Sequence, residues 1–266
     1  MDGDSMKTVV MALSGGMDST CLLMHYLARG YKAVCISYNY GQKHSIELER
    51  AKDSISLCIE NDLEVSHHVV DLSPAMSLFD SALTSKEHDV PLGHYEEDQM
   101  KQTVVPNRNA IFASILYGFA LSETKRTGED VVLALGVHSG DHAIYPDCRP
   151  EFYEALQNAF EIGNWDSERV AFDLPYLHGD KTSILEDAMV SCDMLGLDFD
   201  VVLKNTITSY NPDVNGRSSG QSGSDIERIL AFHAIGREDP IEYQVSWDIA
   251  LENALLVESK HQSGGQ

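Results

Sequence analysis

The sequence lacks the features of a secreted, disulfide-bonded or membrane-spanning protein. Its 266 residues include only five cysteines, none of them in a CxxC pair, so neither disulfides nor a thiolate metal site is expected. No run reaches the roughly 18 apolar residues of a membrane span. The opening residues MDGDSMK also have no signal-peptide character. These absences predict a cytoplasmic protein that makes no membrane contact.

Basic residues are scarce as well. The chain has 19 Lys and Arg against 42 Asp and Glu, which gives a formal net charge of −23. Such a surface repels nucleic-acid phosphate, so no large nucleic-acid surface is expected unless the charges are strongly segregated. Solubility or a salty habitat would account for the acidity, and a basic protein partner is a second explanation.

The most informative segment that is present runs from residue 7 to residue 23, KTVVMALSGGMDSTCLL. Its apolar first half predicts a buried strand, and Asp18, Ser19 and Thr20 are typical of a helix start. Gly15 and Gly16 let the turn between the strand and the helix adopt positive φ and expose backbone N–H groups. Free amides and the positive end of a helix dipole favour phosphate or pyrophosphate. The Walker and GxGxxG patterns are both absent.

Strands and helices alternate along most of the chain. The pattern predicts an α/β fold with a doubly wound parallel sheet, helices on both faces, and ligands beyond the carboxyl ends of the strands. Expected strands cover residues 8–13, 32–38, 63–70, 131–137 and 170–174, and expected helices cover 45–60, 107–120, 151–162 and 181–194.

Three further divisions of the chain follow from composition. Residues 1–200 form the predicted α/β domain, with an inserted lid-like loop at 74–106. Residues 201–258 form a small irregular C-terminal region, rich in Ser and Gly at 209–225 but with a helix near 226–235. Residues 259–266 are expected to be a disordered tail.

Several motifs carry a family resemblance. SGGMDST at 14–20 resembles the signature of the PP-loop ATP pyrophosphatases, which have an adenine nucleotide alpha hydrolase-like fold. Further matches are SYNYGQKHSIELERAK at 37–52, VPNRN at 105–109, YPDCRPEF at 145–152 and NTITSYNP at 205–212. Together they make nearly the whole chain similar to the 7-cyano-7-deazaguanine synthase (QueC) family.

The resemblance implies an AMP-forming C–N ligase of queuosine biosynthesis that uses ATP and Mg²⁺. ATP adenylates the carboxylate of 7-carboxy-7-deazaguanine, ammonia displaces AMP to give an amide, and a second ATP activates the amide oxygen so that a nitrile forms. The resemblance also implies a homodimer.

The family's functional positions map onto individual residues here. Asp18, Arg108 and Lys181 are the expected catalytic residues, with Asp18 also contacting magnesium. The expected ATP-binding residues are Ser14, Gly15, Gly16, Met17, Asp18, Ser19, Tyr38, Arg108 and Gly136. The expected substrate-binding residues are Tyr40, Gln42, His138, Tyr145, Asp147, Arg149, Lys204 and Arg228. Structural alternatives stay open: Arg108 as a cap or ion pair of its own helix, Lys181 as a solvated residue, and Asp147 with Arg149 as a local ion pair.

One departure from the family bears on cofactors. Its four zinc-binding cysteines correspond here to Ser209, Ser219, Ser222 and Asp225, with Gly220 retained. Neutral hydroxyls seldom bind zinc, and one carboxylate cannot replace four thiolates. We therefore expect no zinc, and a C-terminal segment that is held by hydrogen bonds or by a partner, or is mobile.

Three functions remain open at this stage. The first is a zinc-free QueC-like enzyme that forms the amide or nitrile. The second retains adenylation but joins the deazaguanine to an amine of a partner protein or other macromolecule, as in antiviral defence. The third is a non-catalytic nucleotide-binding module, which the presence of Ser14, Asp18, Arg108 and Lys181 disfavours.

Overall fold

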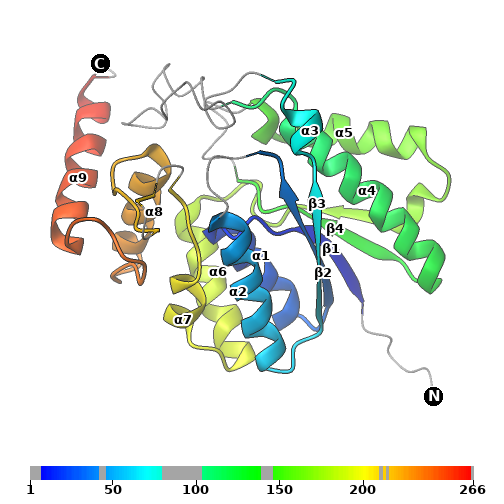
Figure 1. Ribbon diagram of the computed structural model, residues 1–266, viewed down its shortest axis with the longest axis horizontal. Coiled ribbons are helices and arrows are strands. Elements are labelled where there is room, and N and C mark those ends of the chain that lie inside the picture. The colour runs from blue at the N-terminus through cyan, green and yellow to red at the C-terminus, as the bar shows by residue number, and fades with distance from the viewer. Residues whose placement is uncertain are drawn as a thin grey trace.

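Among the described residues, parallel strands form a five-stranded sheet in the order β3-β2-β1-β4-β5 (Figure 1). The computed structural model describes residues 7–41, 46–79, 104–138, 146–209, 212–213 and 216–264. The strands are β1 (Thr8–Ala12), β2 (Lys32–Asn39), β3 (Val65–Asp71), β4 (Val131–Ala134) and β5 (Val170–Asp173). Central β1 pairs with β2 on one side and with β4 on the other. The predicted doubly wound parallel sheet is confirmed.

Alternation along β1 divides the core into two layers. Val9 and Met11 belong to one apolar cluster and Val10 to the other, because successive side chains of a strand point to opposite faces. The first cluster includes residues from α1 (Met17–Ala28), α2 (Ile46–Glu60), α6 (Lys181–Leu195) and α7 (Phe199–Lys204). The second includes residues from α3 (Ser73–Met76), α4 (Arg108–Thr127) and α5 (Pro150–Gly163). Helices therefore cover both faces of the sheet (Figure 1).

Local sequence explains where the site-bearing helices begin. The Asp180 side chain accepts a hydrogen bond from the Ser183 N–H, and the Ser183 hydroxyl accepts one from the Asp180 N–H, so this capping box starts α6 at Lys181. Asn107, with φ of 60°, lies in the left-handed region immediately before α4, which asparagine tolerates better than most residues. The turn sets Arg108 as the first residue of that helix. Both cations thus occupy helix starts at the carboxyl edge of the sheet.

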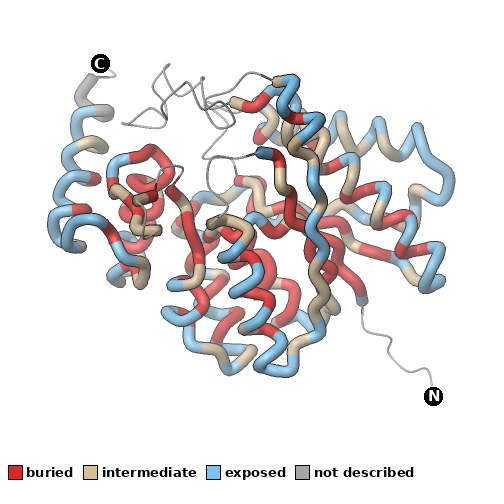
Figure 2. Tube along the Cα trace, viewed as in Figure 1, coloured by how far each residue is buried: buried red, intermediate tan, exposed pale blue. Residues whose placement is uncertain are grey.

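The C-terminal region is more helical than its composition indicates. It contains α8 (Gly223–Ala234) and α9 (Trp247–Gly264), packed around a third apolar cluster with Ile229, Tyr243 and Ala254. The predicted disordered tail at 259–266 is wrong as far as Gly264, because helix propagation from the packed part of α9 carries the backbone onward. The buried side of α8 and the exposed outer side of α9 are visible in Figure 2.

Other boundaries also differ from expectation. The strand expected at 131–137 ends at Ala134, so Gly136 and His138 follow it outside the strand. Most of the predicted lid, residues 80–103, lies outside the described residues, and its role stays a prediction. In the part of the chain that is described, no helix is both long and apolar enough to span a membrane.

Candidate active site

A cavity of about 240 Å³ lies where β1, β2 and β4 end. Parallel α/β sheets bind ligands at this edge. Ser14, Ser19, Tyr38, Arg108 and Gly136, all expected to bind ATP, line it, as does Tyr40 from the expected substrate set. The sequence therefore predicted the position of the cavity and part of its wall.

The turn after β1 is built around Gly15. Its φ is +84°, and a Cβ there would lie 2.1 Å from the Glu47 carbonyl oxygen and 2.8 Å from the Ala51 nitrogen. Gly16 is the N-cap of α1 and has no side-chain cap. The Ser14 hydroxyl accepts from the Gly16 N–H, and the Ser19 hydroxyl donates to the Gly16 carbonyl. The turn thereby leads into α1, which begins at Met17 and contributes Ser19 to the cavity wall.

Gly136 closes the other side of the same turn. A Cβ at Gly136 would lie 3.2 Å from the carbonyl carbon and oxygen of Asp18 and 3.3 Å from the Ser19 Cα. Only a residue without a side chain allows this close approach without displacement. Gly136 thus lets the segment after β4 pack against the glycine turn, and its predicted contact with ATP stays a prediction.

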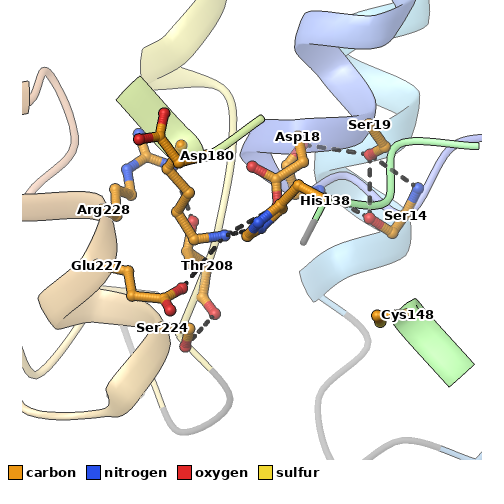
Figure 3. A network of polar contacts seen from close by, with 12 residues as sticks. Ser14, Asp18, Ser19, His138, Cys148, Asp180, Thr208, Ser224, Glu227 and Arg228 are labelled. Carbon is orange, nitrogen blue, oxygen red and sulfur yellow. Dashed lines mark hydrogen bonds and ion pairs between the residues drawn. The ribbon is translucent and has the colours of Figure 1, made fainter. Parts of the chain in front are cut away.

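A buried cation lies beside this turn. The Lys181 Nζ donates to Asp18 Oδ2 at 3.0 Å and lies 3.1 Å from His138 Nε2 (Figure 3). Lys181 is 7% and His138 2% exposed, so Lys181 is not a solvated first-turn residue. Burial alone would raise the pKa of the Asp18 carboxyl, but the charge of Lys181, followed by that of His138, holds the pKa below its ordinary value.

Arg108 projects from the start of α4 over an aromatic wall. Its guanidinium carbon lies 5.8 Å from the centre of the Tyr40 ring. Tyr38 stacks on Phe112 with ring centres 4.1 Å apart and donates to the Phe112 carbonyl. Flat, apolar walls with one cation at the rim suit a planar heterocycle that carries an anionic group.

Tyr153 supplies a hydroxyl to the opposite wall. It belongs to α5, is 2% exposed, and its oxygen has no hydrogen-bond partner among the described residues. Burial raises the pKa of Tyr153 well above its ordinary value, so the phenol is a neutral donor. Such a hydroxyl is a candidate contact for a bound ligand.

The YPDCR motif contributes through Cys148 more than through its charged residues. Cys148 lines the cavity and accepts a weak hydrogen bond from the Asn109 amide at 3.8 Å. Asp147 is half-buried, and its Oδ1 has no partner among the described residues. Arg149 is the exposed N-cap of α5. Gln42 and Tyr145, both predicted to bind substrate, lie outside the described residues.

The structure corrects the role predicted for Arg228. Its side chain is completely buried and makes two hydrogen bonds to Asp239, one each to the hydroxyls of Thr206 and Thr208, and one to the Leu203 carbonyl. A guanidinium has five N–H donors, so none remains for substrate. Arg228 is instead a structural cation that ties α8 to the segment after α7.

Lys204 is also separate from the main cavity. It is the last residue of α7 and lines a second cavity of about 190 Å³ together with Arg50 and Arg217. The Ile207 N–H donates to the Gly15 carbonyl, so the segment after Lys204 does reach the glycine turn after β1. Lys204 itself is exposed.

A hydrogen-bond network occupies the region of the missing cysteines. Asp225 Oδ2 accepts from the Ser219 hydroxyl and from the N–H groups of Gly220 and Ser222. Ser222 and Asp225 also form the capping box that begins α8. Ser209 is also buried. The carbonyl of the preceding residue, Thr208, accepts a hydrogen bond from the Ser224 hydroxyl (Figure 3). Of the alternatives for this segment, the described part adopts the hydrogen-bonded one.

Sequence reasoning missed several wall residues. These are chiefly Glu47, Asn109, Phe112, Cys148 and Tyr153. Asn109 and Cys148 lie within the VPNRN and YPDCR motifs, which could have indicated them. Tyr153 comes directly after the YPDCRPEF segment at 145–152, and only the turn of α5 brings it to the cavity.

Fold and site together define a class. A glycine turn between the first strand of a parallel sheet and the helix that follows it, beside an aromatic cavity with Arg108 in its wall, is the arrangement of PP-loop proteins with the adenine nucleotide alpha hydrolase-like fold.

Comparisons with known proteins identify the family. The model of the queuosine biosynthesis protein QueC matches residues 8–236. The 7-cyano-7-deazaguanine synthase of Marinomonas sp. is 40% identical over 90% of this chain and 99% of that protein. The 7-cyano-7-deazaguanine synthase of Caldicellulosiruptor saccharolyticus is 42% identical over 90% of this chain and 97% of that protein. The NMN synthetase of Francisella tularensis is similar at 15% identity and TM-score 0.40, over 96% of this chain and 85% of that one. The chain belongs to the QueC family.

Proposed function

We propose that this protein uses ATP to adenylate the carboxylate of 7-carboxy-7-deazaguanine and then converts it with ammonia to the amide and the nitrile. The observation that carries the proposal is the glycine turn after β1, in which only glycine fits at position 15, beside a cavity lined by Ser14, Ser19 and Arg108. Relatives about 40% identical over nearly their whole length bear the name of the nitrile-forming synthase.

The chemistry requires charge to be balanced at two centres. A carboxylate oxygen attacks the α phosphorus, and pyrophosphate leaves with its bonding electrons. Ammonia then attacks the acyl carbon, AMP departs, and the nitrogen loses a proton. A second adenylation at the amide oxygen releases pyrophosphate, and AMP then leaves with that oxygen while the nitrogen loses its two remaining protons and the nitrile forms. The start of α1, Arg108 and Lys181 would stabilise negative charge on the phosphates.

Magnesium fits the residues that are present. Asp18 Oδ1 is buried and has no partner among the described residues, while Oδ2 is engaged by Lys181. An ionised carboxylate beside phosphates is a usual magnesium ligand. Asp18 would hold the ion, which when bound neutralises part of the pyrophosphate charge.

We further propose that the protein works without zinc, as a homodimer in the cytoplasm. Support for the first point is the Asp225 network, in which serine hydroxyls stand where thiolates would be needed. Metal analysis of the purified protein is expected to find zinc well below one ion per chain, and a chelator should leave Tm unchanged. The molar mass measured by light scattering after size-exclusion chromatography would test the dimer.

Transfer to an amine of a partner protein, an antiviral-defence activity, is the second candidate. The altered residues from Ser209 to Asp225 and the net charge of −23 favour it, because this segment departs from the zinc-binding pattern and an acidic surface suits a basic partner. A non-catalytic nucleotide-binding role is the third candidate and has least support.

Mass spectrometry separates these functions. The protein is incubated with ATP, magnesium and 7-carboxy-7-deazaguanine, with ammonium or with a candidate protein amine. An amide or nitrile mass supports the first proposal, an adduct on protein the second, and ATP binding without AMP the third. Asp18→Asn and Arg108→Ala should abolish AMP formation. Lys125→Ala, which removes an exposed cation from the same helix as Arg108, should not.

A further inference from the structure

The buried Lys181 ammonium has a third neighbour that neither the motifs nor the cavity indicate. Glu227 Oε2 lies 3.6 Å from the Lys181 Nζ, an ion-pair distance longer than a hydrogen bond. Asp18 and His138 approach the same nitrogen from α1 and from the segment after β4. Glu227 comes from α8, in the C-terminal region (Figure 3). Three other parts of the chain thus converge on the ammonium that α6 supplies.

The position of Glu227 is fixed by its own helix. The next residue, Arg228, is fully buried and ion-paired with Asp239 at 2.6 Å. Two residues earlier, Asp225 completes the capping box that begins α8. Anchors on both sides leave the Glu227 side chain little freedom to move away from Lys181. Its carboxylate is therefore built into the site rather than drawn there by a ligand.

A carboxylate here has an electrostatic cost for ATP binding. Asp18 and Glu227 place two negative charges around one lysine, close to a turn suited to phosphate, and like charges repel in a partly buried site. A group serving only to bind ATP would be a cation or a neutral donor. The useful effect of Glu227 must therefore act through the lysine.

We propose that Glu227 is a positioning residue that holds the Lys181 ammonium against Asp18 and His138, and so couples the C-terminal helices to ATP activation. The proposal rests on the function proposed above, because it assigns Lys181 to the charge that develops on the phosphates. Glu227 itself is not placed in contact with ATP.

Kinetics of AMP formation test the role of the charge. Glu227→Gln keeps the shape of the side chain and removes the charge. It is expected to lower kcat about tenfold, because a misplaced catalytic group costs at least that much. KM for ATP should stay unchanged or fall, since one repelling charge is gone. Glu227→Asp, which keeps the charge, should recover part of kcat. Glu186→Gln removes an exposed carboxylate from α6 and should change neither constant.

A second measurement does not depend on turnover. Acetylation of Lys181 in the protein without ATP, followed by peptide mass spectrometry and normalised to exposed Lys204, should be several-fold faster in Glu227→Gln than in Glu186→Gln. If neither the wild type nor any variant forms AMP, the proposed function fails. The acetylation rates still decide whether Glu227 holds Lys181. Equal acetylation rates would overturn the proposal. So would a rise in KM for ATP with kcat unchanged, which would mean that Glu227 contributes to binding ATP rather than to positioning Lys181.

Discussion

Gly15 has a backbone conformation and a surrounding space that no other residue can share. Its φ of +84° is unfavourable for L side chains by about 1–2 kcal/mol. The added Cβ would also overlap the backbone of α2, where it cannot be relieved by rotating a side chain. The same glycine thus opens the turn for phosphate and lets α2 pack behind it.

Substitution of Gly15 by alanine separates these two effects. Gly15→Ala should lower the free energy of unfolding by about 2–4 kcal/mol and abolish ATP binding, since overpacking adds to the φ strain. Gly30→Ala is the matched control, because Gly30 has φ of +77° but open space around it. It should cost only about 1 kcal/mol and leave ATP binding intact. Urea unfolding and calorimetry measure both quantities, and equal losses for the two variants would contradict the packing argument.

For Tyr153 we expect a substitution to change ligand binding without a loss of stability. Tyr153→Phe removes a buried hydroxyl that has no partner among the described residues, so the free energy of unfolding should stay level or rise by about 1 kcal/mol. Affinity for one of the two ligands, ATP or 7-carboxy-7-deazaguanine, should fall about fivefold, corresponding to one lost hydrogen bond. Isothermal calorimetry with each ligand identifies which one.

Tyr176 provides the contrast. Its hydroxyl donates to Asp187 at 2.7 Å, away from the cavity. Tyr176→Phe should destabilise the protein by about 1.5–3 kcal/mol, because the lost hydrogen bond is to a charged group, and should leave both affinities unchanged. If Tyr153→Phe behaved like Tyr176→Phe, its hydroxyl would have a structural partner and no role in binding.

At the scale of elements, α8 depends on a carboxyl group that is deeply buried. Burial raises the pKa of Asp225, while hydrogen bonds from Ser222, Ser219 and Gly220 oppose that shift without cancelling it. A group whose pKa is higher in the folded than in the unfolded protein stabilises the fold fully below the unfolded pKa. That contribution is lost as the pH rises through the folded pKa.

Comparison of wild type with Asp225→Asn at several pH values isolates this contribution, because asparagine does not titrate. The wild-type advantage in free energy of unfolding should be greatest near pH 3.8 or below, and should shrink as the pH is raised. Urea unfolding of both proteins between about pH 3.5 and pH 8 measures it, over the range in which a raised carboxyl pKa lies. An advantage that grows with pH would mean that the three donors outweigh burial.

Elements with continuous apolar runs were predictable from the sequence, and those set by distant partners were not. β1 and β2 are buried on both faces, so their apolar runs indicated them directly. α9 has a narrow buried side containing Ala250 and Ala254, which composition alone does not reveal. Arg228 matched a basic position in the family, but its partner Asp239 could not be inferred without the fold. Glu227 was missed for the same reason.

At the scale of the whole molecule, net charge acts on stability. A formal charge of −23 on one folded domain repels itself, whereas the expanded unfolded chain spreads that charge over a larger volume. Salt weakens this repulsion: the screening length falls from about 30 Å at 0.01 M to about 10 Å at 0.1 M and about 3 Å at 1 M. The folded state should therefore gain more from added salt than the unfolded state.

Thermal unfolding at increasing NaCl concentration should accordingly show a Tm that rises by several degrees, mostly below about 0.1 M, where screening changes the longest-range repulsion. A salting-out effect would instead grow steadily towards the highest concentrations. Because the repulsion increases with the square of the net charge, neutralising exposed acids should flatten the curve. The triple variant Glu186→Gln, Asp193→Asn, Glu252→Gln removes three such charges from α6 and α9. A Tm that is independent of NaCl, or a triple variant with the full wild-type response, would mean that local ion pairs such as Arg169–Asp130 govern the salt dependence instead.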